Sequence, residues 1–252
     1  MRKEPECFEA GREVSGAEEP RRRRRRADAG TVRQTPRDAA ALEWLSQMYG
    51  CPLDLLAVGL GVQLPGAREV TNRWRRAGWA EVAKVDLGPL WVWPSQATAR
   101  AYLGWDAGYW RPRPTTTAHT RAVVEVRLWL QQGLTPEGWV SDRMLRHEAS
   151  GGRPRERGQK LPHVPDGVWT APDGRRWAVE VELTPKSEGR TYEALMQASN
   201  RAHQEWRGGV LYVVTEAARP VVEAARARLA HPESVEVRPI EQVRAALTEA
   251  RR

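Results

Sequence analysis

The spacing of hydrophobic residues changes along the first hundred residues of the chain. Apolar residues three and four positions apart, which is helical spacing, occur in three stretches, at residues 36–48, 53–58 and 67–77. A glycine follows each stretch, as is common where helices end. Residues 79–94 instead alternate with period two around a turn, which predicts a β-hairpin. A fourth short helix is expected over residues 95–102.

The remainder of the chain predicts a mixed sheet. A long helix is expected at residues 115–132, and then two strands, 163–169 and 176–184, joined by a turn with the sequence Ala-Pro-Asp-Gly. Helices and strands then alternate, at residues 189–206, 210–215, 217–230, 235–238 and 241–250. This order predicts an α+β or α/β fold.

These patterns predict two domains. Three short helices followed by a hairpin are the order of a winged helix-turn-helix, a class that binds DNA. We therefore expect a basic arm at 1–35, a winged helix-turn-helix DNA-binding domain at 36–104, a linker at 105–114 and a mixed α/β domain at 115–252.

The net charge of +8 is unevenly distributed over the 252 residues. Residues 161–252 carry 13 basic and 13 acidic side chains, so the excess lies entirely in the first 160 residues. The run Arg21 to Arg26 predicts a disordered arm, and a second basic loop spans 153–160. A polyanion partner is therefore expected at the N-terminal part.

Composition excludes several classes of protein. Two cysteines, Cys7 and Cys51, give neither a disulfide framework nor a thiolate zinc site. The chain contains no apolar run of membrane-spanning length and no secretory signal, so we expect a cytoplasmic protein without membrane contact.

The stretch 67–77 is the candidate recognition helix. Val70, Trp74 and Ala77 form a stripe that would hold the helix against its domain. Donor side chains occupy other positions, and they are the candidate contacts to duplex DNA: Arg68, Thr71, Asn72, Arg73, Arg75 and Arg76. Arginine reads guanine and asparagine reads adenine in the major groove, while further arginines bind phosphates. The alternative is a solvated basic face used for contacts with protein.

Carboxylates gather in the second predicted hairpin. Glu180 and Glu182 share one face of their strand, and the preceding strand brings Asp166 to the same neighbourhood. Three carboxylates can hold a hard divalent cation such as Mg²⁺ or Mn²⁺, and Lys186 could reach back as a charged partner. These four residues are the candidate catalytic set, and the three carboxylates are the candidate metal ligands. The alternative is a solvent-facing strand on which glutamates have no special role.

Asp166 followed by Glu180-x-Glu182 resembles the active-site edge of the PD-(D/E)xK nuclease fold, the restriction-endonuclease-like fold. The resemblance has a defect, because that pattern has lysine where this chain has Glu182. Glu125 is a further ligand by analogy with that fold alone.

Over residues 36–245 the chain resembles the replication-relaxation family of actinobacterial plasmids and mobile elements. The similarity is carried by His119-Thr-Arg-Ala-Val-Val-Glu-Val-Arg, His163-Val-Pro-Asp-Gly-Val-Trp and Ala178-Val-Glu-Val-Glu-Leu-Thr-x-Lys-Ser. The resemblance implies a DNA-binding protein of plasmid replication or its control, with a degenerate nuclease-like domain.

Three functions follow from these patterns. The first is duplex DNA binding through the winged helix, with the C-terminal domain used in assembly, for example as a homodimer. The second is a Mg²⁺- or Mn²⁺-dependent endonuclease. The third is an adaptor that binds another replication protein.

Overall fold

A computed structural model describes residues 32–85, 88–152, 163–206 and 208–250 of the chain. Residues from Gln34 onward form one compact unit. The basic arm up to residue 31 and the basic loop at 153–160 lie outside the described residues. The described chain contains helices and two sheets, which confirms the mixed α+β class. Among the described helices, none has the length and apolar character needed to cross a membrane.

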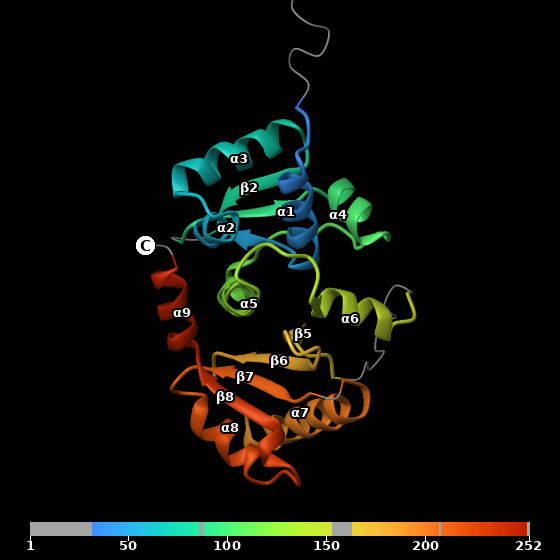
Figure 1. The fold of residues 1–252 in the computed structure, drawn as a ribbon, viewed down its shortest axis with the longest axis vertical. Coiled ribbons are helices and arrows are strands. Elements are labelled where there is room, and N and C mark those ends of the chain that lie inside the picture. Colours follow the sequence, from blue (N-terminus) through green and yellow to red (C-terminus); the bar gives the residue numbers. More distant parts are fainter. Residues whose placement is uncertain (1–31, 86–87, 153–162, 207, 251–252) are drawn as a thin grey trace, which may run out of the picture. The chain divides into compact units, whose positions relative to one another are not determined.

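The first part of the unit contains four helices and a small sheet (Figure 1). Its elements are α1 (Pro36–Gln47), β1 (Cys51–Pro52), α2 (Leu53–Leu60), α3 (Leu64–Arg76), β2 (Ala80–Lys84), β3 (Leu90–Pro94) and α4 (Gln96–Leu103). The strands pair in the antiparallel order β1-β3-β2. The predicted helices and hairpin of this part are therefore confirmed. Trp91 and Trp93, two positions apart on β3, are both buried.

The second part is built on a five-stranded sheet. Its elements are α5 (Pro114–Gln131), β4 (Trp139–Ser141), α6 (Asp142–Ala149), β5 (Gly167–Thr170), β6 (Arg176–Glu182), α7 (Glu188–Arg201) with a π-helical turn (Ala202–Trp206), β7 (Val210–Val214), α8 (Arg219–Arg226), a 3-10 turn (Pro232–Ser234), β8 (Val235–Pro239) and α9 (Ile240–Glu249). The strand order is β4-β5-β6-β7-β8, antiparallel up to β6 and parallel from β6 to β8.

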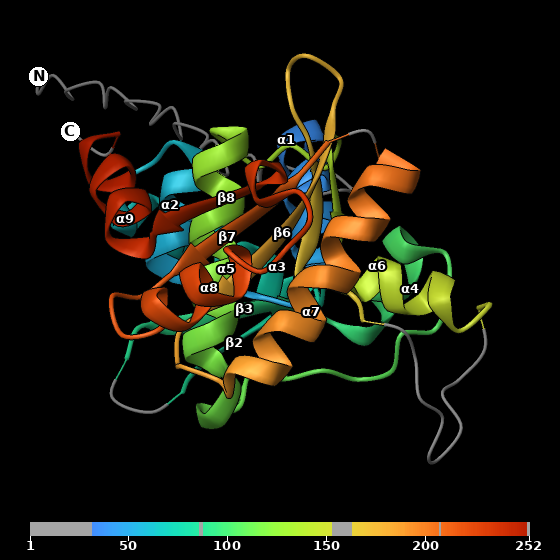
Figure 2. The same ribbon diagram turned by 90° about the horizontal axis from the view of Figure 1, so that it is seen from below.

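Helices cover both faces of this sheet (Figures 1 and 2). Side chains of a strand alternate between faces, so β6 contributes to two cores. Val179 and Val181 pack in the cluster that includes α5, whereas Ala178 packs with Leu195 of α7 and Tyr212 of β7. Glu180 and Glu182 therefore lie on the α7 side of the sheet.

The structure differs from the expected elements around residue 140. Strand β4 and helix α6 were not predicted, because a three-residue strand is too short to show a period. Strand β5 begins at Gly167, later than expected, so Asp166 precedes the strand instead of lying within it. A Cβ atom at Gly167 would lie 2.0 Å from the ring of Trp139, so this close strand contact requires glycine.

The two parts of the unit share one hydrophobic core. Trp44 and Leu56 of the first part belong to the same buried cluster as Val124, Val181 and Leu211 of the second. The segment 105–114, expected to be a linker, packs against its neighbours, since Trp105 stacks on His147 and Trp110 lies against Tyr49. The division into a domain before residue 105 and another after residue 114 stays a prediction.

Arg127 of α5 is fully buried between these parts. Its Nη2 donates to Oε1 of Gln47 at 2.9 Å and to the Thr135 carbonyl at 3.0 Å. Its guanidinium lies 4.9 Å from the ring centroid of Trp44 and 5.7 Å from that of Trp139. Burial lowers the pKa of Arg127 well below its ordinary value.

Asp38 joins α1 to α3 from a buried position. Its carboxylate accepts from the backbone N–H and the hydroxyl of Thr35, which completes the capping box of α1. It also accepts from Nε1 of Trp74 at 2.8 Å and pairs with Arg73. Burial opposes its ionisation, but the bonds from Thr35 and Trp74 and the charge of Arg73 outweigh burial and lower the pKa of Asp38.

We expect Asp38→Asn to lower the free energy of unfolding by about 1–3 kcal/mol at pH 7, the usual cost of disturbing buried bonds to a charged group. Because the pKa of Asp38 is lowered on folding, its contribution is present above the unfolded value of 3.8 and is lost as the pH falls below it. The deficit of the variant should therefore shrink in acid. Urea unfolding between pH 3 and 7 measures this, with the exposed Glu69→Gln as the control. An equal deficit at every pH would contradict the assignment.

Candidate functional site

Helix α3 has one buried face and one exposed face. Ala67, Val70 and Trp74 are buried. Val70 and Trp74 belong to the predicted stripe, whereas its third member, Ala77, is half-buried and caps the end of the helix. The exposed donor side chains are Arg68, Asn72, Arg75 and Arg76. Their spacing of three and four residues places them along one side of the helix.

Two of the predicted DNA contacts serve the fold instead. Thr71 is buried, and its hydroxyl donates to the carbonyl of Ala67 at 2.9 Å. Arg73 pairs with the buried carboxylate of Asp38. Thr71 therefore offers nothing to a ligand, and Arg73 is already engaged with a carboxylate that holds α1.

The exposed face keeps a positive charge. Arg68 and Arg75 have no hydrogen-bond or ion-pair partner among the residues that the structure describes. Asn72, Arg75 and Arg76 line a shallow hollow, together with the acidic side chain of Glu69. The face thus combines arginine and amide donors, the types that contact bases and phosphates.

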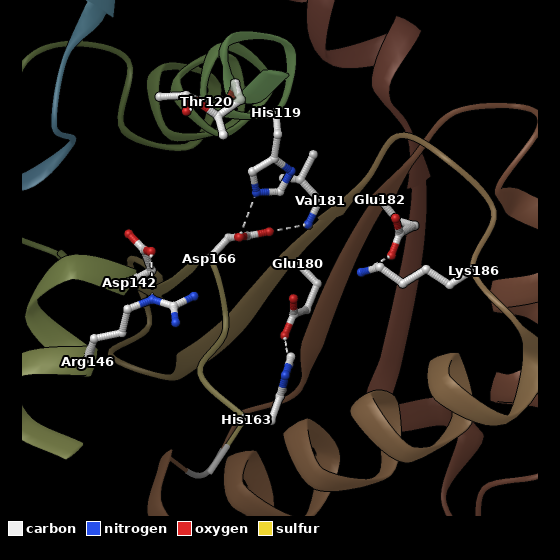
Figure 3. Close-up of polar contacts among 11 residues, drawn as sticks. His119, Thr120, Asp142, Arg146, His163, Asp166, Glu180, Val181, Glu182 and Lys186 are labelled. Atoms are coloured by element: carbon white, nitrogen blue, oxygen red, sulfur yellow. Dashed lines mark hydrogen bonds and ion pairs between the residues drawn. The ribbon is translucent and has the colours of Figure 1, made fainter. Parts of the chain in front are cut away.

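The predicted carboxylates lie at one end of the large sheet, and each has its own partner (Figure 3). Asp166 accepts from the backbone N–H of Val181 at 2.8 Å, and its second oxygen lies 2.9 Å from Nε2 of His119 on α5. The hydrogen bond to Asp166 raises the pKa of His119, although burial acts in the opposite direction.

Glu180 and Glu182 point to different partners (Figure 3). Oε1 of Glu180 lies 2.5 Å from Nε2 of His163, and Oε2 of Glu182 lies 2.6 Å from Nζ of Lys186. Both glutamates are buried, with 7% and 6% of their surface exposed, so the alternative of a solvent-facing strand is wrong. Lys186 does reach back to the strand, as expected.

Burial sets the protonation of the Glu180–His163 pair. Burial raises the pKa of Glu180 to about 7. The hydrogen bond from His163 acts to lower this pKa, and the negative charge of Asp166 acts to raise it. The hydrogen bond to Glu180 in turn raises the pKa of His163. The pair can therefore take up or release a proton near neutral pH, which is the chemistry of an acid–base couple.

The donor set does not fit a divalent cation as it stands. Among the residues with described positions, no three His, Cys, Asp or Glu side chains are grouped so as to hold a metal ion. Both oxygens of Asp166 have hydrogen bonds, and each glutamate faces a basic group. A cation would have to displace these partners.

Glu125, the ligand suggested by analogy, is engaged elsewhere. Its two carboxylate oxygens accept from Arg121 and from Arg244 of α9, each at 2.9 Å. It therefore ties α5 to α9.

The sequence did not reveal some of the residues that lie around Asp166, Glu180 and Glu182. His119 meets Asp166 across 47 residues, and the chain carries no local signal for such a contact. Asp142 and Arg146 pair beside them at 3.1 Å, and their i, i+4 spacing is the one signal that could have suggested this pair. Burial raises the pKa of Asp142, and the charge of Arg146 opposes this.

Comparisons with protein-family models, curated proteins and solved structures give no match. The resemblance to the replication-relaxation family therefore stays a prediction.

We expect the stability of the protein to depend on the Glu180–His163 pair between pH 5 and 8. The pKa values of Glu180 and His163 are both raised by folding. Between pH 4.5, the ordinary pKa of Glu180, and about pH 7, its raised pKa, the folded protein therefore keeps a proton that the unfolded chain releases. The stability that this proton gives is complete at low pH and is lost as the pH rises through 7. Glu180→Gln should flatten this fall, which reaches about 1.4 kcal/mol per pH unit for one extra proton.

Urea unfolding of both proteins at four pH values measures the slopes. Glu193→Gln, an exposed change on α7, is the matched control. Identical slopes for the wild type and Glu180→Gln would show that the pair does not titrate in this way.

Proposed function

We propose that the chain binds duplex DNA through the exposed face of α3. The observation that carries this proposal is the division of α3 into a face fixed by Val70 and Trp74 and a face that offers Arg68, Asn72 and Arg75. A recognition helix needs a buried face and an exposed face, because side chains that contact the DNA groove must project from a helix that is packed firmly against its domain.

The surrounding elements support a winged helix-turn-helix. Helix α3 follows α1 and α2 and precedes the β2–β3 hairpin, and β1 completes a three-stranded sheet with that hairpin. In this arrangement the third helix enters the major groove. Arg68, Asn72 and Arg75 would then face base edges or phosphates, and Arg76 would add a phosphate contact.

The second part of the unit would serve assembly. Its last 92 residues carry no net charge, so they offer little general attraction to DNA. A role in plasmid or mobile-element replication, a homodimer and a replication-protein partner rest on the resemblance. A DNA ligand agrees with the expected cytoplasmic location.

Arg68→Ala with Arg75→Ala should weaken duplex binding at least tenfold. Each arginine that contacts a base or phosphate contributes about 1–3 kcal/mol. The slope of log affinity against log salt should also become shallower, by about 0.9 for each phosphate that the variant no longer binds. Fluorescence anisotropy with a labelled duplex at several salt concentrations measures both quantities.

Arg190→Ala with Arg219→Ala is the matched control, since it removes two exposed helical arginines, from α7 and α8. The wild type and both double variants keep the run Arg21 to Arg26, so any contribution of that run is common to them. If both double variants lose the same affinity for duplex DNA, the loss is explained by net charge and not by contacts made by α3. A chain that binds no duplex at low salt would favour the adaptor alternative, which a pull-down of replication proteins would then test.

The endonuclease alternative requires the carboxylates to leave their basic partners. Asp166, Glu180 and Glu182 contact His119, His163 and Lys186, so we expect supercoiled plasmid to stay intact with Mg²⁺ or Mn²⁺. Agarose gels at protein concentrations that saturate duplex binding would show this. Nicking by the wild type that Glu180→Ala abolishes would restore the nuclease hypothesis.

A further inference from the structure

A second basic surface, which shares no lining residue with the hollow on α3, lies between the β2–β3 hairpin and the segment that leads into α5. We call it the basic hollow and define it by Lys84, Trp93, Tyr109, Arg111 and Arg113. Its volume is about 430 Å³, within the range of about 300–1,000 Å³ that is usual for ligand sites. None of the six predicted DNA contacts lines it.

Three cations line the hollow, and among the described residues the carboxylate of Glu81 is bonded to its Tyr109. Lys84, Arg111 and Arg113 are exposed, and none has an ion-pair partner among the residues that the structure describes. None of the lining residues is acidic. Positive charges held together on an exposed surface attract a ligand with several negative charges. The successive phosphates of a nucleic-acid strand form such a ligand.

Tyr109 gives the hollow an exposed aromatic ring. Its side chain is 56% exposed, and Tyr109 and Leu64 are the exposed large hydrophobic side chains of the described chain. Its hydroxyl donates to Oε2 of Glu81 at 2.9 Å, which ties the ring to β2. The neighbouring Trp105 stacks on His147, and Trp110 lies tilted against Tyr49, so Tyr109 alone of this segment's aromatic residues is left exposed.

We propose that the basic hollow binds single-stranded nucleic acid, with phosphates on Lys84, Arg111 and Arg113 and one base stacked on Tyr109. A fixed aromatic ring beside a line of cations is the combination by which proteins hold a single strand without reading its sequence. The bases of a duplex are stacked on one another and cannot cover such a ring. The proposal does not depend on duplex binding by α3, because the two surfaces share no residue.

The test is the affinity of the full chain for a labelled oligo(dT) of about 15 nucleotides, measured by fluorescence anisotropy. Tyr109→Ala should weaken binding about fivefold or more, because stacking of one base contributes about 1–3 kcal/mol. Tyr109→Phe keeps the ring but loses the bond to Glu81, so it should weaken binding less than Tyr109→Ala does. Unchanged affinity of Tyr109→Ala for oligo(dT) would overturn the proposal.

The phosphate contacts have a separate readout. Arg111→Ala with Arg113→Ala should make the salt slope for oligo(dT) shallower by about 1.4, at about 0.7 for each phosphate of a single strand. Arg190→Ala with Arg219→Ala is again the control of equal charge. Identical slopes in the two double variants would overturn the phosphate assignment.

Two measurements separate this surface from α3 and from the N-terminal arginines. Ultraviolet cross-linking of oligo(dT) that carries 5-iodouracil should attach to the peptide containing Tyr109, and attachment solely elsewhere would overturn the proposal. Arg68→Ala with Arg75→Ala should keep the oligo(dT) affinity while duplex binding weakens. If the Tyr109 and Arg111/Arg113 variants weaken duplex and oligo(dT) binding equally, the hollow is a duplex contact and the single-strand proposal fails.

Discussion

The buried guanidinium of Arg127 is the contact on which the arrangement of this molecule depends. A buried cation is costly unless hydrogen bonds and polarisable groups replace its water. Here the amide oxygen of Gln47 comes from α1, a carbonyl comes from Thr135, and the rings of Trp44 and Trp139 flank the group. These partners come from both parts of the chain, so the bonds of Nη2 and the two ring contacts form together only when α1, α5 and β4 meet. Nη1 is buried without a hydrogen-bond partner among the described residues. No carboxylate among the described residues bonds to it, which makes the aromatic faces part of its solvation.

Helix α5, which contains Arg127, also contacts the carboxylate cluster, the basic hollow and α9. His119 lies eight residues before Arg127, about 12 Å along the helix, and meets Asp166 at the end of the sheet. Arg113, the residue before the first turn, lines the basic hollow. Glu125 binds Arg244 and so fixes α9 on the same helix. One helix therefore sets the positions of the hollow, the carboxylate cluster and the C-terminal helix (Figure 1).

Sequence reasoning recovered what depends on local order and missed what depends on contacts across the chain. Periodicity is a local property, and it located α3, the β2–β3 hairpin and the alternating faces of β6. Thr71 was misplaced because a helical wheel cannot show that its hydroxyl bonds back to Ala67 and that the side chain is covered. The burial of Glu180 and Glu182 could not be predicted either, because it depends on α7 covering a face that polar residues had marked as exposed.

The carboxylates change the electrostatic argument about DNA. Three bare carboxylates at one sheet end would repel a phosphate backbone, and the sequence made them candidate ligands of a divalent cation. The chain instead supplies His119, His163 and Lys186, one basic group for each carboxylate. The hydrogen bonds to Asp166 and Glu180 raise the pKa values of both histidines, while burial raises the pKa of Glu180 to about 7. Glu182 stands where the resemblance to the PD-(D/E)xK fold would place lysine, and its charge is balanced by Lys186 four residues later. A site balanced in this way needs no cation in order to fold, because each carboxylate already faces a basic group of the chain.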